Sequence, residues 1–119
     1  MAYLFLGYPK CSTSGKAQKW LDDNNIEYEF RDIVKNNPTK TELKEWIKNS
    51  RRPIRKFFNT SGLLYKSMGL KDKLDSMSDA EQIELLSGNG MLVKRPLLLG
   101  KNTVIVGFKP QEWEEQLKK

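Results

Sequence analysis

The side chains best suited to chemistry in this sequence surround one cysteine. Cys11 is the single cysteine among 119 residues. A thiol acts as a nucleophile only as its thiolate, and a thiolate is stabilised by nearby donors and positive charge. Lys10 and Lys16 supply charge on either side of it. Hydroxyl donors follow it directly, from Ser12, Thr13 and Ser14. The loop therefore predicts a thiol with a lowered pKa.

Two alternatives remain beside that prediction. An isolated cysteine is more often an inert residue that packs as a small hydrophobe. The same loop donors could also hold a tetrahedral oxyanion, as the start of a helix commonly does. Because the residues from Pro9 to Ser14 are mostly polar, they suit an exposed junction better than a core. We therefore favour a reactive thiol over an inert one.

The absence of histidine narrows the chemistry that Cys11 can perform. With no histidine and one cysteine, the chain can build neither a Cys–His catalytic pair nor a histidine-containing or cysteine-rich metal site. It also cannot form an internal disulfide. We expect no bound cofactor and no metal, and an external thiol must complete any reduction that Cys11 begins.

The elements that position Cys11 follow from the apolar pattern. Residues 3–6 form a continuous apolar run, typical of a strand buried on both faces. Apolar residues then recur at helical spacing from Ser14, and residues 26–30 alternate as a second strand. A strand, a helix and a strand in close succession predict a βαβ unit with parallel strands. Cys11 would lie at the helix start, where unpaired N–H groups and the helix dipole favour an anion.

Residues 36–90 are predicted to be almost wholly helical. Thr39–Glu42 and Ser78–Glu81 each match the capping box that opens a helix. Between them we expect three short helical pieces, at 55–58, 63–68 and 71–74.

Strand character returns after this block. Residues 95–99 and 104–106, separated by a turn at 100–103, predict a β-hairpin. Pro110 suits the first position of a last helix. The order βαβ, helices, ββα predicts an α/β protein with a single domain.

The composition limits location and partners. A net charge of +6 favours anionic ligands, which include nucleic acid, oxyanions and anionic thiols. No apolar run approaches the roughly 20 residues that span a bilayer, and the N-terminal run lacks the features of a signal peptide. We expect a cytoplasmic monomer that does not bind membranes. No aromatic platform accompanies the basic cluster of Arg51, Arg52, Arg55 and Lys56, so we favour a solvated face over direct nucleic-acid binding there.

Taken together, four segments resemble the arsenate reductase (ArsC)/Spx family. They are the loop at 9–14, the central helical segment at 53–70, the Lys94-Arg95-Pro96 element and Gly107–Pro110. The resemblance covers essentially the whole chain in order. It implies a thioredoxin-like, four-stranded mixed sheet formed by about residues 1–35 and 91–119, with a helical insertion at about 36–90.

The resemblance also implies roles for particular residues. In the family's reductases a cysteine attacks arsenate, glutathione resolves the adduct, and three arginines surround the anion. Two of them correspond to Arg55 and Arg95. From the loop chemistry above we expect Ser12, Thr13 and Ser14 to be further anion ligands. Lys109 stands in the place of the third and lacks the planar fork that suits an oxyanion, which argues against arsenate itself. The family fold implies a cis bond before Pro96.

Two functions follow as hypotheses. The first is a thiol oxidoreductase with Cys11 as nucleophile, acting on a small oxyanion or a mixed disulfide, with a low-molecular-weight thiol or a glutaredoxin resolving the adduct. The second is an Spx-like transcriptional regulator that binds the α subunit of RNA polymerase. Spx carries Cys-x-x-Cys in this loop, whereas the second position here is Ser14. That redox switch is therefore unavailable to this chain.

Overall fold

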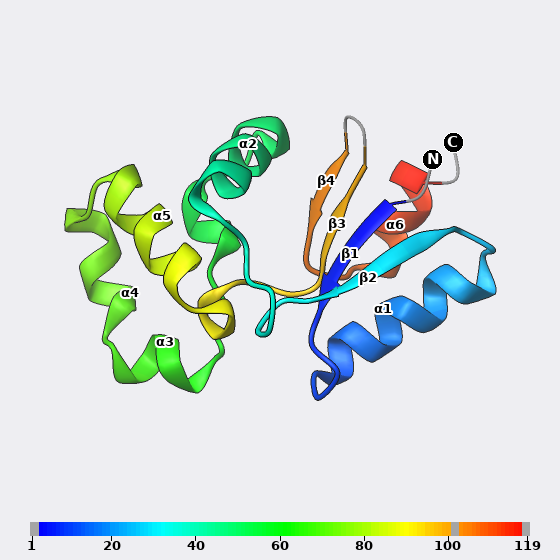
Figure 1. Ribbon diagram of the computed structural model, residues 1–119, viewed down its shortest axis with the longest axis horizontal. Helices are drawn as coiled ribbons and strands as arrows, with labels where there is room; N and C mark the ends of the chain where they lie inside the picture. The colour runs from blue at the N-terminus through cyan, green and yellow to red at the C-terminus, as the bar shows by residue number, and fades with distance from the viewer. Residues whose placement is uncertain (1–2, 101–102, 118–119) are drawn as a thin grey trace.

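The centre of the computed structural model, which describes residues 3–100 and 103–117, is a four-stranded sheet in the order β2-β1-β3-β4 (Figure 1). β1 (Tyr3–Gly7) pairs in parallel with β2 (Tyr28–Asp32) and antiparallel with β3 (Leu97–Leu99). β4 (Val104–Val106) pairs antiparallel with β3. The sheet is mixed, as the thioredoxin-like fold requires, and the predicted fold class is confirmed.

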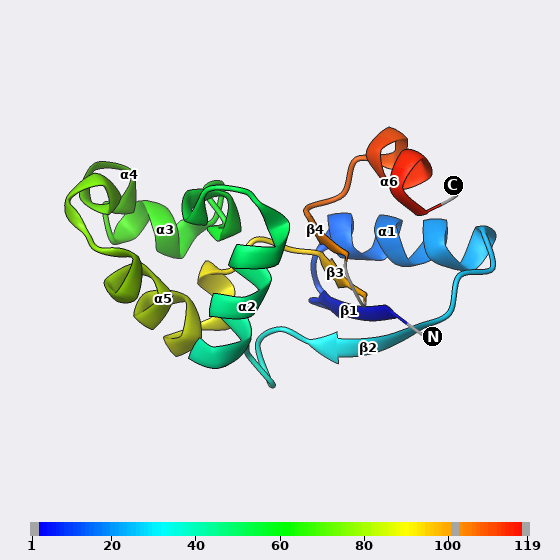
Figure 2. The same ribbon diagram turned by 90° about the horizontal axis from the view of Figure 1, so that it is seen from above.

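One face of this sheet is covered by α1 (Ser12–Asp23) and α6 (Pro110–Leu117), as Figure 2 shows. Side chains alternate between the two faces of a strand, so every second strand residue points toward these helices. The core on this side, here called the α1–α6 core, consists of Phe5, Ala17, Leu21, Leu98, Ile105 and Trp113. Neighbouring strand residues such as Leu6 and Leu97 point to the opposite face. The strand at 3–6 is thus buried on both faces, as its apolar run predicts.

The opposite face joins the core of the helical insertion. This part contains α2 (Lys40–Ser50), α3 (Leu63–Ser67), α4 (Leu70–Lys73) and α5 (Asp79–Gly88), which lie to one side of the sheet in Figure 1. Short 3₁₀ turns at 54–57 and 74–76 lie between these helices, and a third at 90–92 leads from α5 toward β3. Both predicted capping boxes are confirmed, since α2 and α5 each begin with reciprocal side-chain and backbone hydrogen bonds.

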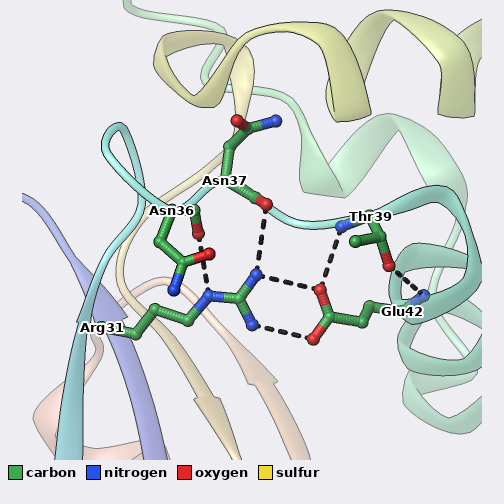
Figure 3. Close-up of polar contacts among 5 residues, drawn as sticks. All are labelled: Arg31, Asn36, Asn37, Thr39 and Glu42. Atoms are coloured by element: carbon green, nitrogen blue, oxygen red, sulfur yellow. Dashed lines mark hydrogen bonds and ion pairs between the residues drawn. The ribbon is translucent and has the colours of Figure 1, made fainter.

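A polar cluster joins the end of β2 to the start of α2 (Figure 3). The guanidinium of Arg31 donates to both carboxylate oxygens of Glu42, at 2.8 and 2.9 Å, and to the carbonyl oxygens of Asn36 and Asn37. Glu42 also belongs to the capping box with Thr39. Since Arg31 lies in β2 and Glu42 in α2, one ion pair links the sheet to the first helix of the insertion.

Three elements begin two residues away from their predicted start. β2 begins at Tyr28 rather than at residue 26, because the N–H of Ile26 is used to bond the carbonyl of Leu21 after α1. α1 begins at Ser12 rather than Ser14. β3 begins at Leu97 rather than at residue 95, since Pro96 has no N–H to donate to a neighbouring strand. Part of the predicted hairpin turn, residues 101–102, lies outside the described residues.

The described part of the molecule is elongated, with principal extents of 42 × 27 × 25 Å. None of its helices combines the length and the apolar character needed to cross a membrane.

Candidate functional site around Cys11

Cys11 is the residue that precedes the first turn of α1. Its backbone is extended, with φ −95° and ψ 118°, and its carbonyl accepts the N–H of Gly15 at 3.1 Å, which begins the helix. The chain reaches this position by a tight turn after β1, closed by the bond from the N–H of Cys11 to the carbonyl of Tyr8. The predicted place of the thiol, between strand end and helix start, is confirmed.

Hydrogen bonds around the sulfur favour its ionised form. Burial of the side chain is the largest single influence, and it alone would raise the pKa of Cys11. Donors from the backbone N–H and hydroxyl of Ser14, the N–H of Thr13 and the guanidinium of Arg95 act against it. Together they hold the pKa of Cys11 below its ordinary value. The neutral thiol makes no capping hydrogen bond, so these donors are available to the thiolate.

Ser14 is held in place to serve as one of these donors. Its side chain is buried, and its hydroxyl oxygen accepts the N–H of Tyr8 at 3.2 Å. An oxygen already used as an acceptor keeps its proton to donate, which suits an anionic sulfur next to it.

Arg95 is the charged donor to the thiol. Its guanidinium lies over the ring of Tyr8, with 5.5 Å from Cζ to the ring centroid, and makes long bonds of 3.4 Å to the carbonyls of Met91 and Val93. Its buried Nε has no hydrogen-bond partner among the described residues. The Arg95–Pro96 bond is cis, as the resemblance implies, and Pro96 is buried.

A cleft of about 1090 Å³ opens beside these groups. Cys11, Thr13, Arg95 and Lys109 line it, so four predicted site residues meet in one cavity. Its far wall comes from the helical insertion, through Asn59, residues 61–64 and Ser67. The cleft therefore lies between the thioredoxin-like part and the insertion.

Two predicted site residues lie elsewhere. Ser12 is exposed and is absent from the walls of the cleft. Arg55 pairs with Asp75 at 3.0 Å and lines a neighbouring cavity instead of the one beside Cys11. The structure therefore separates Arg55 from the sulfur, although both belong to the same predicted anion site.

Sequence reasoning missed several residues of the cleft. The ring of Tyr8 packs against the guanidinium of Arg95, and Lys94 adds a third basic side chain to the lining, after Arg95 and Lys109. Leu63 is 87% exposed and, with Met91 and Phe108, gives the cleft an apolar margin. Tyr8 directly precedes the motif at 9–14, and Lys94 belongs to the Lys94-Arg95-Pro96 element, so proximity in sequence could have indicated both. Leu63 resembles an ordinary helix residue and gave no such signal.

Two known proteins are similar to this chain over most of its length. The YusI protein of Bacillus subtilis is 46% identical, over 97% of this chain and 98% of its own. The global transcriptional regulator Spx of Streptococcus agalactiae is 27% identical, over 94% of this chain and 80% of its own.

Two solved structures share the fold over nearly the full length. One is an ArsC family related protein from Bacteroides fragilis, with a TM-score of 0.93, 58% identity and 97% of both chains covered. The other is described as a possible arsenate reductase from Streptococcus mutans, with a TM-score of 0.86, 41% identity and coverage of 94% of this chain and 97% of that one. The model of the ArsC family matches residues 6–116, which include Cys11, the cleft and the whole insertion. The chain therefore belongs to the ArsC family.

Proposed function

We propose that this protein is a thiol-dependent oxidoreductase in which Cys11 is the nucleophile. The observation that carries the proposal is the convergence of Ser14, Thr13 and Arg95 on the Cys11 sulfur at the edge of a large cleft. A surface cysteine without a function needs neither a lowered pKa nor a guanidinium beside it.

The reaction begins when the Cys11 thiolate attacks one sulfur of a disulfide. A new bond forms between the Cys11 sulfur and that sulfur, the original bond breaks, and the second half leaves as a thiolate. Arg95 stabilises negative charge both on the attacking sulfur and on the leaving sulfur beside it.

An external thiolate then attacks the mixed disulfide at the substrate sulfur. Cys11 leaves as the thiolate that began the cycle, and the external thiol becomes part of the disulfide product. A lowered pKa makes Cys11 a good leaving group in this second step. A small thiol such as glutathione, or a glutaredoxin, supplies the external sulfur. The cleft volume is large enough for a small molecule of that size.

Mass spectrometry of the intact protein after exposure to glutathione disulfide tests this proposal. We expect one glutathionyl group on the wild-type protein, removed by excess glutathione, and none on Cys11→Ser. Turnover should be followed with glutathione as the electron donor, on the wild type and on Cys11→Ser. Disulfide reduction by Cys11→Ser at the wild-type rate would contradict the assignment.

A second candidate function is regulation through RNA polymerase. It is favoured by the similarity to Spx over most of both chains and by the exposed Leu63 on the insertion. A binding titration with the C-terminal domain of the polymerase α subunit tests it, with Leu63→Ser as the surface variant. Micromolar binding weakened by Leu63→Ser would support the regulator, and no binding at those concentrations would reject it.

A further inference from the structure

A second cavity, of about 390 Å³, lies against the cleft that contains Cys11. The two share three lining residues, Lys94, Val106 and Lys109, so one continuous depression leads from the sulfur into the second cavity. We call the second one the basic cavity. Its lining includes five cationic side chains, from Arg52, Arg55, Lys56, Lys94 and Lys109.

Negative charge within the basic cavity does not balance these cations. Glu112 is the one carboxylate among its described lining residues, and it pairs with Arg52 at 3.3 Å. Arg55 pairs with Asp75, an exposed residue outside the lining. For Lys56, Lys94 and Lys109, no ion pair is found among the described residues. Like charges gathered in a concave surface repel one another and create a positive potential that attracts an anion.

The position of Arg55 supports a role distant from the sulfur. The family resemblance suggests that it binds an anion at Cys11, yet it lines the basic cavity and not the Cys11 cleft. A ligand that reaches both cavities must therefore carry its anionic group some distance from its reacting sulfur. An inorganic oxyanion bound at Cys11 does not meet this requirement, whereas an organic thiol with an anionic end does.

We propose that the basic cavity binds the anionic end of a low-molecular-weight thiol or its disulfide, while the sulfur of that ligand reacts at Cys11. Carboxylates and phosphates share the required chemistry. The inference rests on the proposed function, because it names the class of co-substrate that the same cysteine uses. Arg55 and Lys56 bind the anionic end, and Lys94 and Lys109 lie at the junction of the two cavities.

The test compares the rates at which three disulfides modify Cys11. Glutathione disulfide carries carboxylates, coenzyme A disulfide carries phosphates, and cystamine carries amines with neither group. Each reaction is ordinary thiol–disulfide exchange, so a mixed disulfide forms and one thiolate leaves. The measured quantity is the ratio of second-order rate constants, anionic reagent over cystamine, at low ionic strength.

The variant is Arg55→Gln/Lys56→Gln, since neither residue lines the Cys11 cleft. Its control is Lys44→Gln/Lys71→Gln, which removes the same charge from exposed positions outside both cavities. We expect the ratio for at least one anionic reagent to fall by about tenfold in the variant and to change little in the control. The faster anionic reagent identifies the ligand as a carboxylate or a phosphate.

If the rate ratios of the variant and the control are equal and all reagents modify Cys11 rapidly, the proposed anion site in the basic cavity is wrong. The proposal of a reactive thiol at Cys11 would still hold. Slow modification of the wild type by all three reagents would instead overturn the proposed function itself. Circular dichroism and thermal unfolding of both double variants verify that each has folded.

Discussion

At the scale of single residues, the chemistry of Cys11 depends on the positions of Ser14 and Arg95, which have no special reactivity of their own. Ser14 is a buried serine whose oxygen is fixed by the N–H of Tyr8, and this arrangement leaves its proton for the sulfur. The guanidinium of Arg95 lies over the ring of Tyr8 and donates to two backbone carbonyls, and it has further N–H groups that can donate to the sulfur. Burial of the thiol raises the pKa of Cys11, and the hydrogen bonds from these donors must outweigh that effect.

Replacement of Ser14 by alanine should raise the pKa of Cys11, because a hydrogen bond to the thiolate is lost. The ultraviolet absorbance of the thiolate, followed against pH, measures this change. Ser76→Ala, an exposed serine of the insertion, is the matched control and should not alter the titration. An unchanged titration in Ser14→Ala would show that its hydroxyl does not reach the sulfur.

Removal of the positive charge at position 95 should also raise the pKa of Cys11. Arg95→Gln takes away the guanidinium that stabilises the thiolate, so alkylation at neutral pH should slow several-fold. Arg95→Lys should recover part of the rate, because the charge remains while the planar fork is lost. Equal rates in wild type and Arg95→Gln would remove Arg95 from the site.

At the scale of elements, the Arg31–Glu42 pair decides how β2 meets α2. The side chain of Arg31 is 14% exposed and that of Glu42 33% exposed, so the pair is partly shielded from water and salt. Arg31 also lies 5.9 Å from the ring centroid of Trp46 in α2. Several contacts from one side chain therefore fix the start of the insertion against the sheet.

Arg31→Ala should lower the free energy of unfolding by about 1–2 kcal/mol, since a shielded carboxylate loses its partner. Chemical denaturation measures this loss. The exposed pair of Lys19 and Asp23 in α1 gives the control, where Lys19→Ala should cost at most about 0.5 kcal/mol. Equal costs at the two positions would contradict the proposed importance of the junction.

The same pair predicts a dependence of stability on pH. Hydrogen bonds from Arg31 are the largest influence on Glu42 and, with those from Thr39, hold its pKa below the usual value despite burial. Stabilisation by Glu42 is therefore complete above the pKa of an unfolded glutamate and is lost as the pH falls through the lower folded pKa. The stability difference between wild type and Glu42→Gln should shrink across that acidic window. A difference that does not vary with pH would contradict this account.

At the scale of the whole molecule, the cleft depends on how the helical insertion packs against the thioredoxin-like part of the chain. Gly90 lies where the chain returns from α5 toward β3, and it contacts the backbone that follows β2. A Cβ at this position would overlap the carbonyl oxygen of Ile33 and lie 2.8 Å from its carbonyl carbon. The side chain of Asn37 also donates to the carbonyl of Ser87. This close approach holds the end of the insertion against the segment that follows β2.

Gly90→Ala should therefore destabilise the protein by about 3 kcal/mol, because the added methyl group forces two backbone segments apart. Gly88→Ala is the control, since a Cβ there meets no atom within 4 Å. Thermal unfolding of the two variants measures the contrast. A stable Gly90→Ala protein would show that the junction is looser than described.

The sequence predicted most of the fold because its signals were local. Two capping boxes and an apolar run each depend on neighbouring residues, and each formed as expected, whereas the strand predicted at 26–30 formed at 28–32. The boundary of β2 could not be foreseen, because a turn after α1 takes the N–H of Ile26.

The site was predictable only in part, because local sequence signals do not indicate how distant segments pack together. Cys11, Thr13 and Arg95 meet as the motifs imply. The pairing of Arg55 with Asp75, 20 residues away, and the exposure of Leu63 depend on how the insertion packs. Tertiary packing of this kind leaves no pattern in the sequence near either residue.

The pKa of Cys11 in the folded protein tests the central claim most directly. The rate of alkylation by iodoacetamide should be measured against pH, on the native protein and on the same protein unfolded in urea. We predict a native midpoint clearly below the unfolded one, since the folded loop and Arg95 stabilise the thiolate. A native midpoint equal to or above the unfolded one would contradict a catalytic thiolate at Cys11.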